Sequence, residues 1–352
     1  MTYASFGCSL DVLDAPEKMA MKLAFLNALR EGIITGPVAR DPYELVTEAL
    51  GNAPGLVSIG RLEIEPWMTP RPNIDAIDMV DVSLYREFID TGGCDVVSAR
   101  LREFVRERVL PLTPLLIGVD HSLSGGVLEA LRAAGERDIS LVVLDSHFDA
   151  IPASLRRAAG AREEKAEADQ GRDDEEPPDS YTCGTWLAQV IESGTVAPEM
   201  VAVIGPSDYP GAETADGEPE AMTAYRGAYL AFEERGVKVI PKQRVREVGV
   251  GEAAREAIES VGGSAVYLSI DADIGSGDEI KAVRFLDTIG LAADEVVELC
   301  GALALEVRSA GSSLAGFDIM EIDVHLADVP GSGDRTVEMC ANAAREVMRV
   351  MG

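Results

Sequence analysis

The stretch LVVLDSHFDA, residues 141–150, joins a run of four apolar residues to three polar residues at alternate positions. The apolar run has the length and composition of a buried strand. Side chains two residues apart in an extended segment point the same way, so Asp145, His147 and Asp149 are expected to converge. The chain has three histidines, and one of them stands here between two aspartates. This arrangement predicts a ligand site at the end of a strand.

Similar apolar runs recur along the chain and alternate with helical patterns. The predicted strands are LLIG (115–118), LVVL (141–144), VAVIG (201–205), VKVI (237–240), AVYLSI (265–270) and LAGFDIM (314–320). The predicted helices cover residues 124–135, 185–194, 252–263, 291–307 and 334–352. Strands that are apolar on both faces and alternate with helices predict an α/β protein with a parallel sheet covered by helices.

Two regions depart from this regular alternation. The first hundred residues are less periodic, and WMTPRPNID (67–75) is typical of a loop. Residues 156–180 are rich in charge and contain glycines and a proline pair, which predicts an exposed loop insertion. Because this insertion follows Asp149 closely, it is placed to overhang the site predicted there.

The composition narrows the class of protein. A chain of 352 residues with 47% hydrophobic residues can bury a substantial core in one large α/β domain or two ordinary ones. Its net charge of −30 disfavours binding to nucleic acid or to anionic membrane surfaces, and it is compatible with a high-salt cytoplasm. No secretory signal or transmembrane run is present, and no cysteine forms a CxxC pair. We therefore expect a cytoplasmic protein with reduced thiols.

Polar residues also follow three other predicted strands where the apolar runs end. They are Asp120 and His121, Asp271 and Asp273, and Asp318, Glu321 and Asp323. In an open parallel sheet, ligands bind at the carboxyl ends of the strands. Each motif alone is more often a turn, a cap or a core residue than a site. Together they use two of the three histidines, and this coincidence favours a shared site.

Carboxylates gathered in one place repel each other, and divalent cations relieve that repulsion. Four aspartates with two histidines form a mixed oxygen and nitrogen ligand set. Such a set suits Mn²⁺ better than metals that prefer thiolates, and zinc remains possible. The carboxylates are numerous enough to bridge two metal ions, an arrangement that activates hydroxide.

The motifs together resemble those of the ureohydrolases, the family of arginase, agmatinase and formimidoylglutamase. The matching segments are GVDHS (118–122), DSHFD (145–149), SIDAD (269–273) and DIMEID (318–323). Their order and spacing fit that family, and the resemblance covers roughly residues 110–350.

The resemblance implies a three-layer α/β/α fold with a central, mainly parallel sheet, formed by residues 1–352 as one domain. It also implies two Mn²⁺ ions per subunit and a homo-oligomer, a trimer or a hexamer. By motif, one ion would be held by His121, Asp145, Asp149 and Asp271, and the other by Asp145, His147, Asp271 and Asp273.

The activity implied is hydrolysis of a small linear guanidino or amidino compound. A hydroxide bridging the metals would attack the guanidinium or amidinium carbon. Asp149 would hydrogen-bond the hydroxide and help to protonate the leaving nitrogen. Glu321 would face the planar cation, which a carboxylate can pair with through two charge-assisted hydrogen bonds.

The chain also departs from the family pattern. Val119 and Ser146 replace a usual Gly and Ala, and GSGDE (275–279) replaces a usual Asp-Pro step. Cys183 in YTCGTW stands where arginases and agmatinases typically have a proton-shuttle histidine and formimidoylglutamases a serine. Cys183 is therefore a candidate catalytic residue, or alternatively a buried apolar one. His325 could replace the missing shuttle, or it could be a solvated loop residue.

Two alternatives to this hydrolase remain open. One is a non-catalytic relative of the same fold that binds a ligand or a partner chain. The other is a zinc-dependent deacetylase of related fold, which the small number of histidines disfavours. The substrate itself, whether agmatine, arginine, formimidoylglutamate or a relative, depends on loops such as 66–76, 150–182 and 206–222, for which we read no motif.

Overall fold

A single sheet forms the centre of the computed structural model, which describes residues 1–36, 38–136, 138–152, 154–155, 180–211, 219–327, 329 and 331–352. Its strands are β1 (Tyr3–Cys8), β2 (Leu56–Arg61), β3 (Thr113–Gly118), β4 (Ile139–Leu144), β5 (Val201–Ile204), β6 (Lys238–Ile240), β7 (Ala265–Asp271) and β8 (Ser313–Met320). They lie in the order β2-β1-β3-β8-β7-β4-β5-β6. Every strand pairing within the described residues is parallel.

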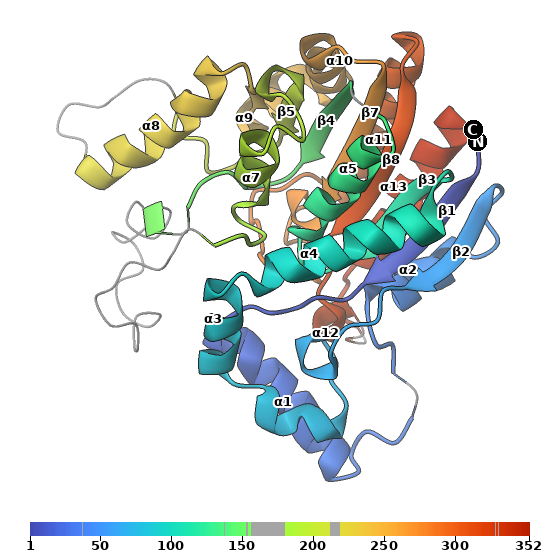
Figure 1. Ribbon diagram of the computed structural model, residues 1–352, viewed down its shortest axis with the longest axis vertical. Coiled ribbons are helices and arrows are strands. Elements are labelled where there is room, and N and C mark those ends of the chain that lie inside the picture. The colour runs from blue at the N-terminus through green and yellow to red at the C-terminus, as the bar shows by residue number, and fades with distance from the viewer. Residues whose placement is uncertain are drawn as a thin grey trace.

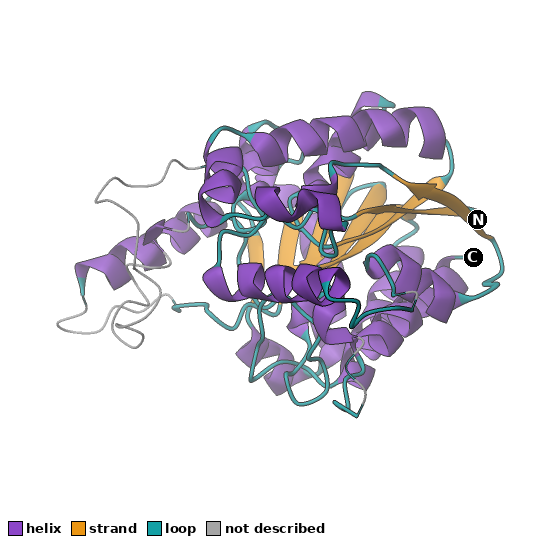
Figure 2. Ribbon diagram, turned by 90° about the horizontal axis from the view of Figure 1, so that it is seen from below, coloured by secondary structure: helices purple, strands orange, loops and turns teal. Residues whose placement is uncertain are grey.

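Helices cover both faces of this sheet (Figures 1 and 2). The α-helices of the described residues include α1 (Pro16–Arg30), α2 (Pro42–Leu50), α3 (Val82–Asp90), α4 (Gly93–Phe104), α5 (Leu123–Ala133), α7 (Trp186–Glu192), α8 (Glu220–Glu234), α9 (Lys242–Val248), α10 (Val250–Val261), α11 (Ala293–Ser309), α12 (Val324–Ala327) and α13 (Thr336–Met351). Of these, α1, α3 and α8 project away from the sheet (Figure 1). The predicted three-layer α/β/α fold is thereby confirmed.

The strands are apolar on both faces because each face packs against a helical layer. Along β4, Val142 and Leu144 belong to the apolar core on one side of the sheet, and Leu141 and Val143 belong to the core on the other. All four side chains are buried. This alternation explains why the strand sequence is a continuous apolar run rather than an alternating one.

The strands and helices predicted from periodicity are present with boundaries within two residues of the prediction. The irregular N-terminal hundred residues nevertheless contain β1 and β2 as well as four helices. Within 67–75, the predicted loop, lie the end of one 3-10 helix (Pro66–Met68) and the start of another (Ile74–Met79). Residues 156–179 of the predicted charged insertion lie outside the described residues.

The sheet order explains how distant motifs meet. The strands β3, β8, β7 and β4 are consecutive neighbours in the sheet. Because they are parallel, their carboxyl ends lie along one edge, and all four motif segments begin there. The fold therefore brings together segments that are up to two hundred residues apart in the chain.

Candidate metal centre

The metal-site carboxylates help to form the turns that place them beyond the strand ends. The Asp145 Oδ1 atom accepts a hydrogen bond from the His147 N–H at 2.6 Å. The Asp271 Oδ1 atom accepts one from the Asp273 N–H at 2.8 Å. Such aspartate turns end each strand sharply. The polar side chains that follow are thus positioned at the edge of the sheet.

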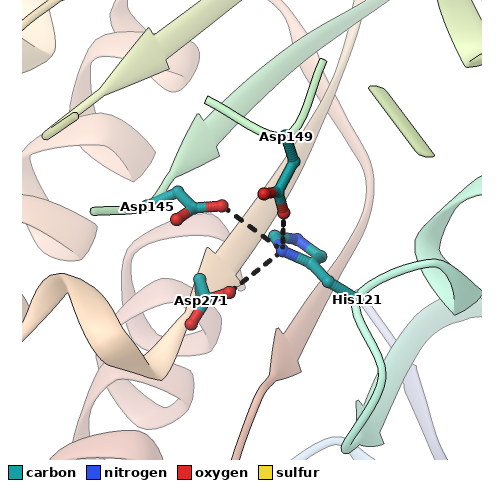
Figure 3. A group of neighbouring side chains, drawn as sticks. All are labelled: His121, Asp145, Asp149 and Asp271. Carbon is teal, nitrogen blue, oxygen red and sulfur yellow. Dashed lines mark ion pairs between the residues drawn. The ribbon is translucent and has the colours of Figure 1, made fainter. Parts of the chain in front are cut away.

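The first cluster surrounds the imidazole of His121 (Figure 3). His121 Nδ1 lies 3.4 Å from Asp145 Oδ2, 3.2 Å from Asp149 Oδ2 and 3.0 Å from Asp271 Oδ2. All four residues are buried, and their ligand atoms lie within 4.8 Å of one another. One nitrogen and three carboxylate oxygens thus face a common point.

The second cluster consists of Asp145, His147 and Asp273. His147 Nδ1 lies 3.0 Å from Asp273 Oδ2 and 3.5 Å from Asp145 Oδ1. Asp145 directs one oxygen to each cluster and so links the two. The structure thus brings all six predicted metal ligands into two adjoining groups. Asp271 lies with the first group, and its predicted sharing between two ions stays a prediction.

A hydrogen-bond relay orients the His121 ring. His121 Nε2 lies 2.8 Å from Ser269 Oγ, and Ser269 Oγ donates to Asp318 Oδ1 at 2.8 Å. Tyr267 donates to the other oxygen of Asp318 at 2.8 Å. With the Ser269 proton directed at Asp318, the serine oxygen accepts from Nε2–H, and the lone pair of Nδ1 then faces the carboxylates. This is the tautomer that a metal ligand requires.

The charges of the clusters fit divalent cations. Burial raises the pKa of Asp271 well above its usual value, and Asp273 and Asp145 raise it further. Burial opposes protonation of His121, but Asp145, Asp149 and Asp271 raise the pKa of that imidazole well above its usual value. A metal cation would use the same negative field and displace the proton.

Unsatisfied atoms support the same conclusion. Among the described residues, the buried atoms His121 Nδ1, Asp145 Oδ2 and Asp273 Oδ2 have no hydrogen-bond partner. Buried polar atoms are rarely left in this way unless water or an ion satisfies them. A set of carboxylate oxygens and imidazole nitrogens is the donor set that Mn²⁺ accepts. The residues of both clusters therefore fit a pair of divalent metal ions.

The predicted catalytic residue Cys183 precedes by three residues Trp186, which contacts the first cluster. Burial raises the pKa of its thiol well above the usual value, and the negative charges of Asp120 and Glu321 raise it further. The thiol therefore stays protonated near neutral pH. Close by in the chain, Trp186 donates from Nε1 to Asp149 Oδ2 at 3.2 Å, and its ring centroid lies 4.7 Å from that of His121.

The predicted catalytic residue Glu321 follows β8 with a left-handed backbone, at φ 64°. Its Oε1 atom accepts a hydrogen bond from the His121 N–H at 2.9 Å and another from Arg284 Nη1 at 3.1 Å. Burial raises the pKa of Glu321 to about 8, against the lowering effect of Arg284. The carboxylate therefore already has a guanidinium partner within the chain.

His325 lies away from both clusters. Its Nε2 atom is 2.7 Å from the carbonyl oxygen of Pro70, and its ring packs against Phe25 with centroids 5.8 Å apart. The side chain is thus engaged between α1, α12 and the segment at residue 70, rather than standing free in a loop.

Sequence reasoning missed several residues of the site. Ser269 and Trp186 lie within the quoted motifs SIDAD and YTCGTW, and the order of strands in the sheet would have suggested their supporting roles. Asp318 was predicted as a polar residue of the shared site, but not as the acceptor of the Ser269 hydrogen bond. Arg284 gave no such signal, because it lies in the loop after β7 where the chain departs from the family pattern.

The model of the arginase family matches residues 54–349 of the chain. This protein belongs to the arginase family. The match confirms the resemblance to ureohydrolases. The buried His/Asp clusters lie within the matched residues of this arginase-family chain.

Individual relatives are more distant. The chain is 28% identical over 211 residues to proclavaminate amidinohydrolase of Streptomyces clavuligerus, a match that covers 59% of this chain. It spans about half of that relative, 53% of its length. Formimidoylglutamase of Bacillus subtilis has the same fold, with a TM-score of 0.59, 14% identity and coverage of 100% of this chain and 87% of that one.

The fold is also that of a formiminoglutamase of Trypanosoma cruzi whose structure was solved with Mn²⁺. The TM-score is 0.55 at 14% identity, and the match covers 99% of this chain and 92% of that one. No helix in the described part of the arginase-family chain has the length and apolar character needed to cross a membrane.

Proposed function

We propose that this arginase-family protein is a hydrolase that cleaves a C–N bond of a small linear guanidino or amidino compound and requires two Mn²⁺ ions per subunit. The observation that carries the proposal is the pair of adjoining His/Asp clusters linked by Asp145. The family membership and the Mn²⁺ in the Trypanosoma cruzi relative support the same reading.

The two clusters support the assignment of ligands that we propose. His121, Asp145, Asp149 and Asp271 would hold one, and Asp145, His147 and Asp273 the other, with Asp271 as a further shared ligand. When bound, the metal ions would lower the pKa of water and so supply a nucleophile at neutral pH.

Asp149 is the residue of this chain best placed to move a proton. Its Oδ2 atom is fixed by Trp186 Nε1 at 3.2 Å, and its side chain is 9% exposed, more than those of Asp145 and Asp271. A fixed carboxylate beside the reacting carbon can accept a proton from the attacking water and return it to the leaving nitrogen. We assign Asp149 this role.

Glu321 and Cys183 would line the substrate side. In its ionised form, the Glu321 carboxylate would accept charge-assisted hydrogen bonds from the N–H groups of a guanidinium or amidinium cation. The Cys183 thiol, being protonated, can donate a hydrogen bond or a proton but cannot act as a general base near neutral pH. The contribution of Cys183 therefore differs from that of a shuttle histidine, which exchanges protons in both directions.

We extend the proposal to the domain organisation, cellular location and oligomeric state of the protein. We propose one domain over residues 1–352, a cytoplasmic location and a homo-oligomer, a trimer or a hexamer. All five cysteines are free, as a reducing compartment would leave them. The net charge of −30 makes a nucleic-acid or membrane-surface partner unfavourable.

The test is turnover of a defined panel by metallated protein. The protein is loaded with Mn²⁺ and incubated with agmatine, arginine, formimidoylglutamate and related compounds, each followed by mass spectrometry. We expect loss of one compound with formation of urea or formamide, and no loss with Asp145→Ala. Failure of the fully metallated protein to consume any compound would contradict the hydrolase and favour a binding protein. One Zn²⁺ per chain, bound in preference to Mn²⁺, would favour a deacetylase.

A further inference from the structure

The loop after β7 places a buried guanidinium beside the metal centre. Arg284 Nη1 lies 3.1 Å from Asp120 Oδ2 and 3.1 Å from Glu321 Oε1. Asp120 precedes the metal ligand His121, whose N–H donates to the same oxygen of Glu321. The Arg284 side chain is 2% exposed. Arginine side chains are ordinarily exposed to solvent, but this one is buried and pairs with the residue that precedes a candidate metal ligand.

Backbone pairing holds Arg284 in this position. The Arg284 N–H donates to the Glu321 carbonyl at 3.0 Å, and the Asp323 N–H donates to the Ala282 carbonyl at 2.9 Å. These bonds flank an antiparallel bridge between Val283 and Ile322. The left-handed backbone of Glu321 lies within the same pairing. The main-chain pairing therefore places the backbone of Arg284 beside that of Glu321, and the ion pairs with Asp120 and Glu321 hold the guanidinium.

The ion pair leaves hydrogen-bonding capacity unused. Among the described residues, Arg284 Nε and Nη2 and Glu321 Oε2 are buried without a hydrogen-bond partner. A guanidinium and a carboxylate paired in two parallel bonds would have satisfied more of these atoms. Arg284 instead divides one nitrogen between Asp120 and Glu321. Its Nε atom lies 3.6 Å from Asp11 Oδ1, so the guanidinium is shared among three carboxyl groups without a two-bond pair to any of them.

We propose that Arg284 is a specificity-determining residue whose guanidinium occupies, from within the chain, the carboxylates that a substrate cation would otherwise reach. The substrate preference that we infer rests on the proposed function. The binding of guanidinium in place of Arg284 does not depend on it. A free guanidinium must displace Arg284, and displacement leaves a buried charge without its partner. The site therefore takes guanidino or amidino compounds of low net positive charge in preference to strongly cationic ones.

The next residue of the loop supports this preference. Phe285 packs its ring against His147, with centroids 5.9 Å apart, and is 38% exposed. His147 is also the more exposed of the two imidazoles, at 32%. The more exposed imidazole of the centre is thus bordered by an aromatic ring, which favours a weakly charged substrate body.

The binding test replaces the internal guanidinium with a free one. Arg284→Ala removes the side chain and leaves space beside Asp120 and Glu321. Guanidinium chloride at low millimolar concentration should then raise the Tm of Arg284→Ala and leave that of the wild type unchanged. Urea, which is planar but uncharged, should stabilise neither protein. Equal responses to guanidinium and urea, or no response of Arg284→Ala to guanidinium, would overturn the inference.

Arg226 of α8 provides a matched control. It is also a buried arginine, 5% exposed, but its guanidinium donates to the carbonyl groups of Pro210 and Gly211 rather than to the carboxylates of the site. Arg226→Ala should lose stability without gaining rescue by guanidinium. If Arg284→Ala does not fold, the same titration is made on the double variant Arg284→Ala/Asp120→Asn. This variant also lacks the negative charge of Asp120, which would otherwise be buried without its partner. Rescue of Arg226→Ala to the same extent would show a non-specific effect and count against the inference.

A second readout uses the metallated enzyme. Wild type should have a lower kcat/KM for agmatine than for formimidoylglutamate, and Arg284→Ala should shift that ratio toward agmatine at least tenfold. An unchanged ratio in an active variant would refute the role of Arg284 while leaving the hydrolase intact. Rescue by guanidinium in a protein without any turnover would support Arg284 as an occupant of the site while refuting the hydrolase.

Discussion

The two imidazoles of the metal centre have different surroundings and therefore different expected roles. His121 is fully buried and oriented by Ser269, whereas the His147 side chain is 32% exposed and belongs only to the second cluster. Asp145 is the only residue common to the two clusters found among the described residues. If each cluster holds one ion, as we propose, loss of one ion would leave the ligands of the other in place.

This asymmetry predicts the metal content of a single variant. His147→Asn should lower the bound Mn²⁺ from about two ions per chain to about one, because the first cluster keeps all four of its residues. Turnover should fall by more than tenfold. Metal analysis after dialysis measures the stoichiometry, and Asp145→Ala, which affects both clusters, is the comparison. Loss of both ions from His147→Asn would contradict two separable sites.

A pH prediction follows from Glu321. Burial raises the pKa of this carboxyl from 4.5 to about 8, against the influence of Arg284, so the folded state holds the proton more tightly than the unfolded chain. The stability contributed is complete below pH 4.5 and is lost as the pH rises through about 8. Glu321→Gln, which cannot ionise, should lack this loss. Across that window, the free energy of unfolding of wild type relative to Glu321→Gln should fall by a few kcal/mol, at about 1.4 kcal/mol per pKa unit.

Denaturant titrations at a series of pH values, with a chelator present in all samples, measure this difference. The chelator matters because metal binding also depends on pH. Parallel pH curves for wild type and Glu321→Gln would mean that Glu321 keeps the same pKa in the folded and unfolded states.

At the scale of secondary structure, close packing between α4 and α5 depends on a glycine. A Cβ atom at Gly126 would lie 2.4 Å from the backbone oxygen of Ser98. Gly126→Ala should therefore push the helices apart and lower the free energy of unfolding by about 1–3 kcal/mol. In contrast, Gly227 in α8 is exposed, and no described atom would lie within 4 Å of its Cβ.

Gly227→Ala is therefore a matched control in a helix. It should stabilise the protein by about 0.5–1 kcal/mol, because alanine loses less backbone entropy on folding than glycine does. Chemical denaturation of both variants gives the two values. Stabilisation by Gly126→Ala would show that α4 and α5 can separate at little cost.

The elements also show what sequence patterns can and cannot reveal. Periodicity identified β4 and its buried neighbours, because apolar runs of that length have few other uses in an α/β protein. It missed β1, YASFGC, whose small and polar residues lack such a run although every residue is buried. Likewise, the motifs identified the residues that the structure gathers into the two His/Asp clusters, because these follow strands directly. The position of Arg284 at the site could not be predicted from the sequence. It depends on main-chain pairing between its loop and residues 321–323, for which no motif exists.

At the scale of the whole molecule, the sheet extends beyond the segment that defines the family. The family match begins at residue 54, yet β1 precedes it and lies between β2 and β3. The chain after β1 also reaches the site, because Asp11 pairs with Lys22 at 2.9 Å and lies 3.6 Å from Arg284 Nε. The N-terminal segment is thus part of the core and of the surroundings of the metal centre.

This placement predicts a large cost for truncating an interior side chain of β1 and a small cost for truncating an exposed side chain of the neighbouring edge strand. Phe6 in β1 is fully buried, whereas Val57 in the edge strand β2 is 43% exposed. Phe6→Ala should lower the free energy of unfolding by about 3–5 kcal/mol, because it leaves a cavity in an interior strand. Val57→Ala should change it by no more than about 0.5 kcal/mol. Urea unfolding followed by circular dichroism compares the two, and equal costs would mean that β1 is peripheral to a core formed by residues 54–349 alone.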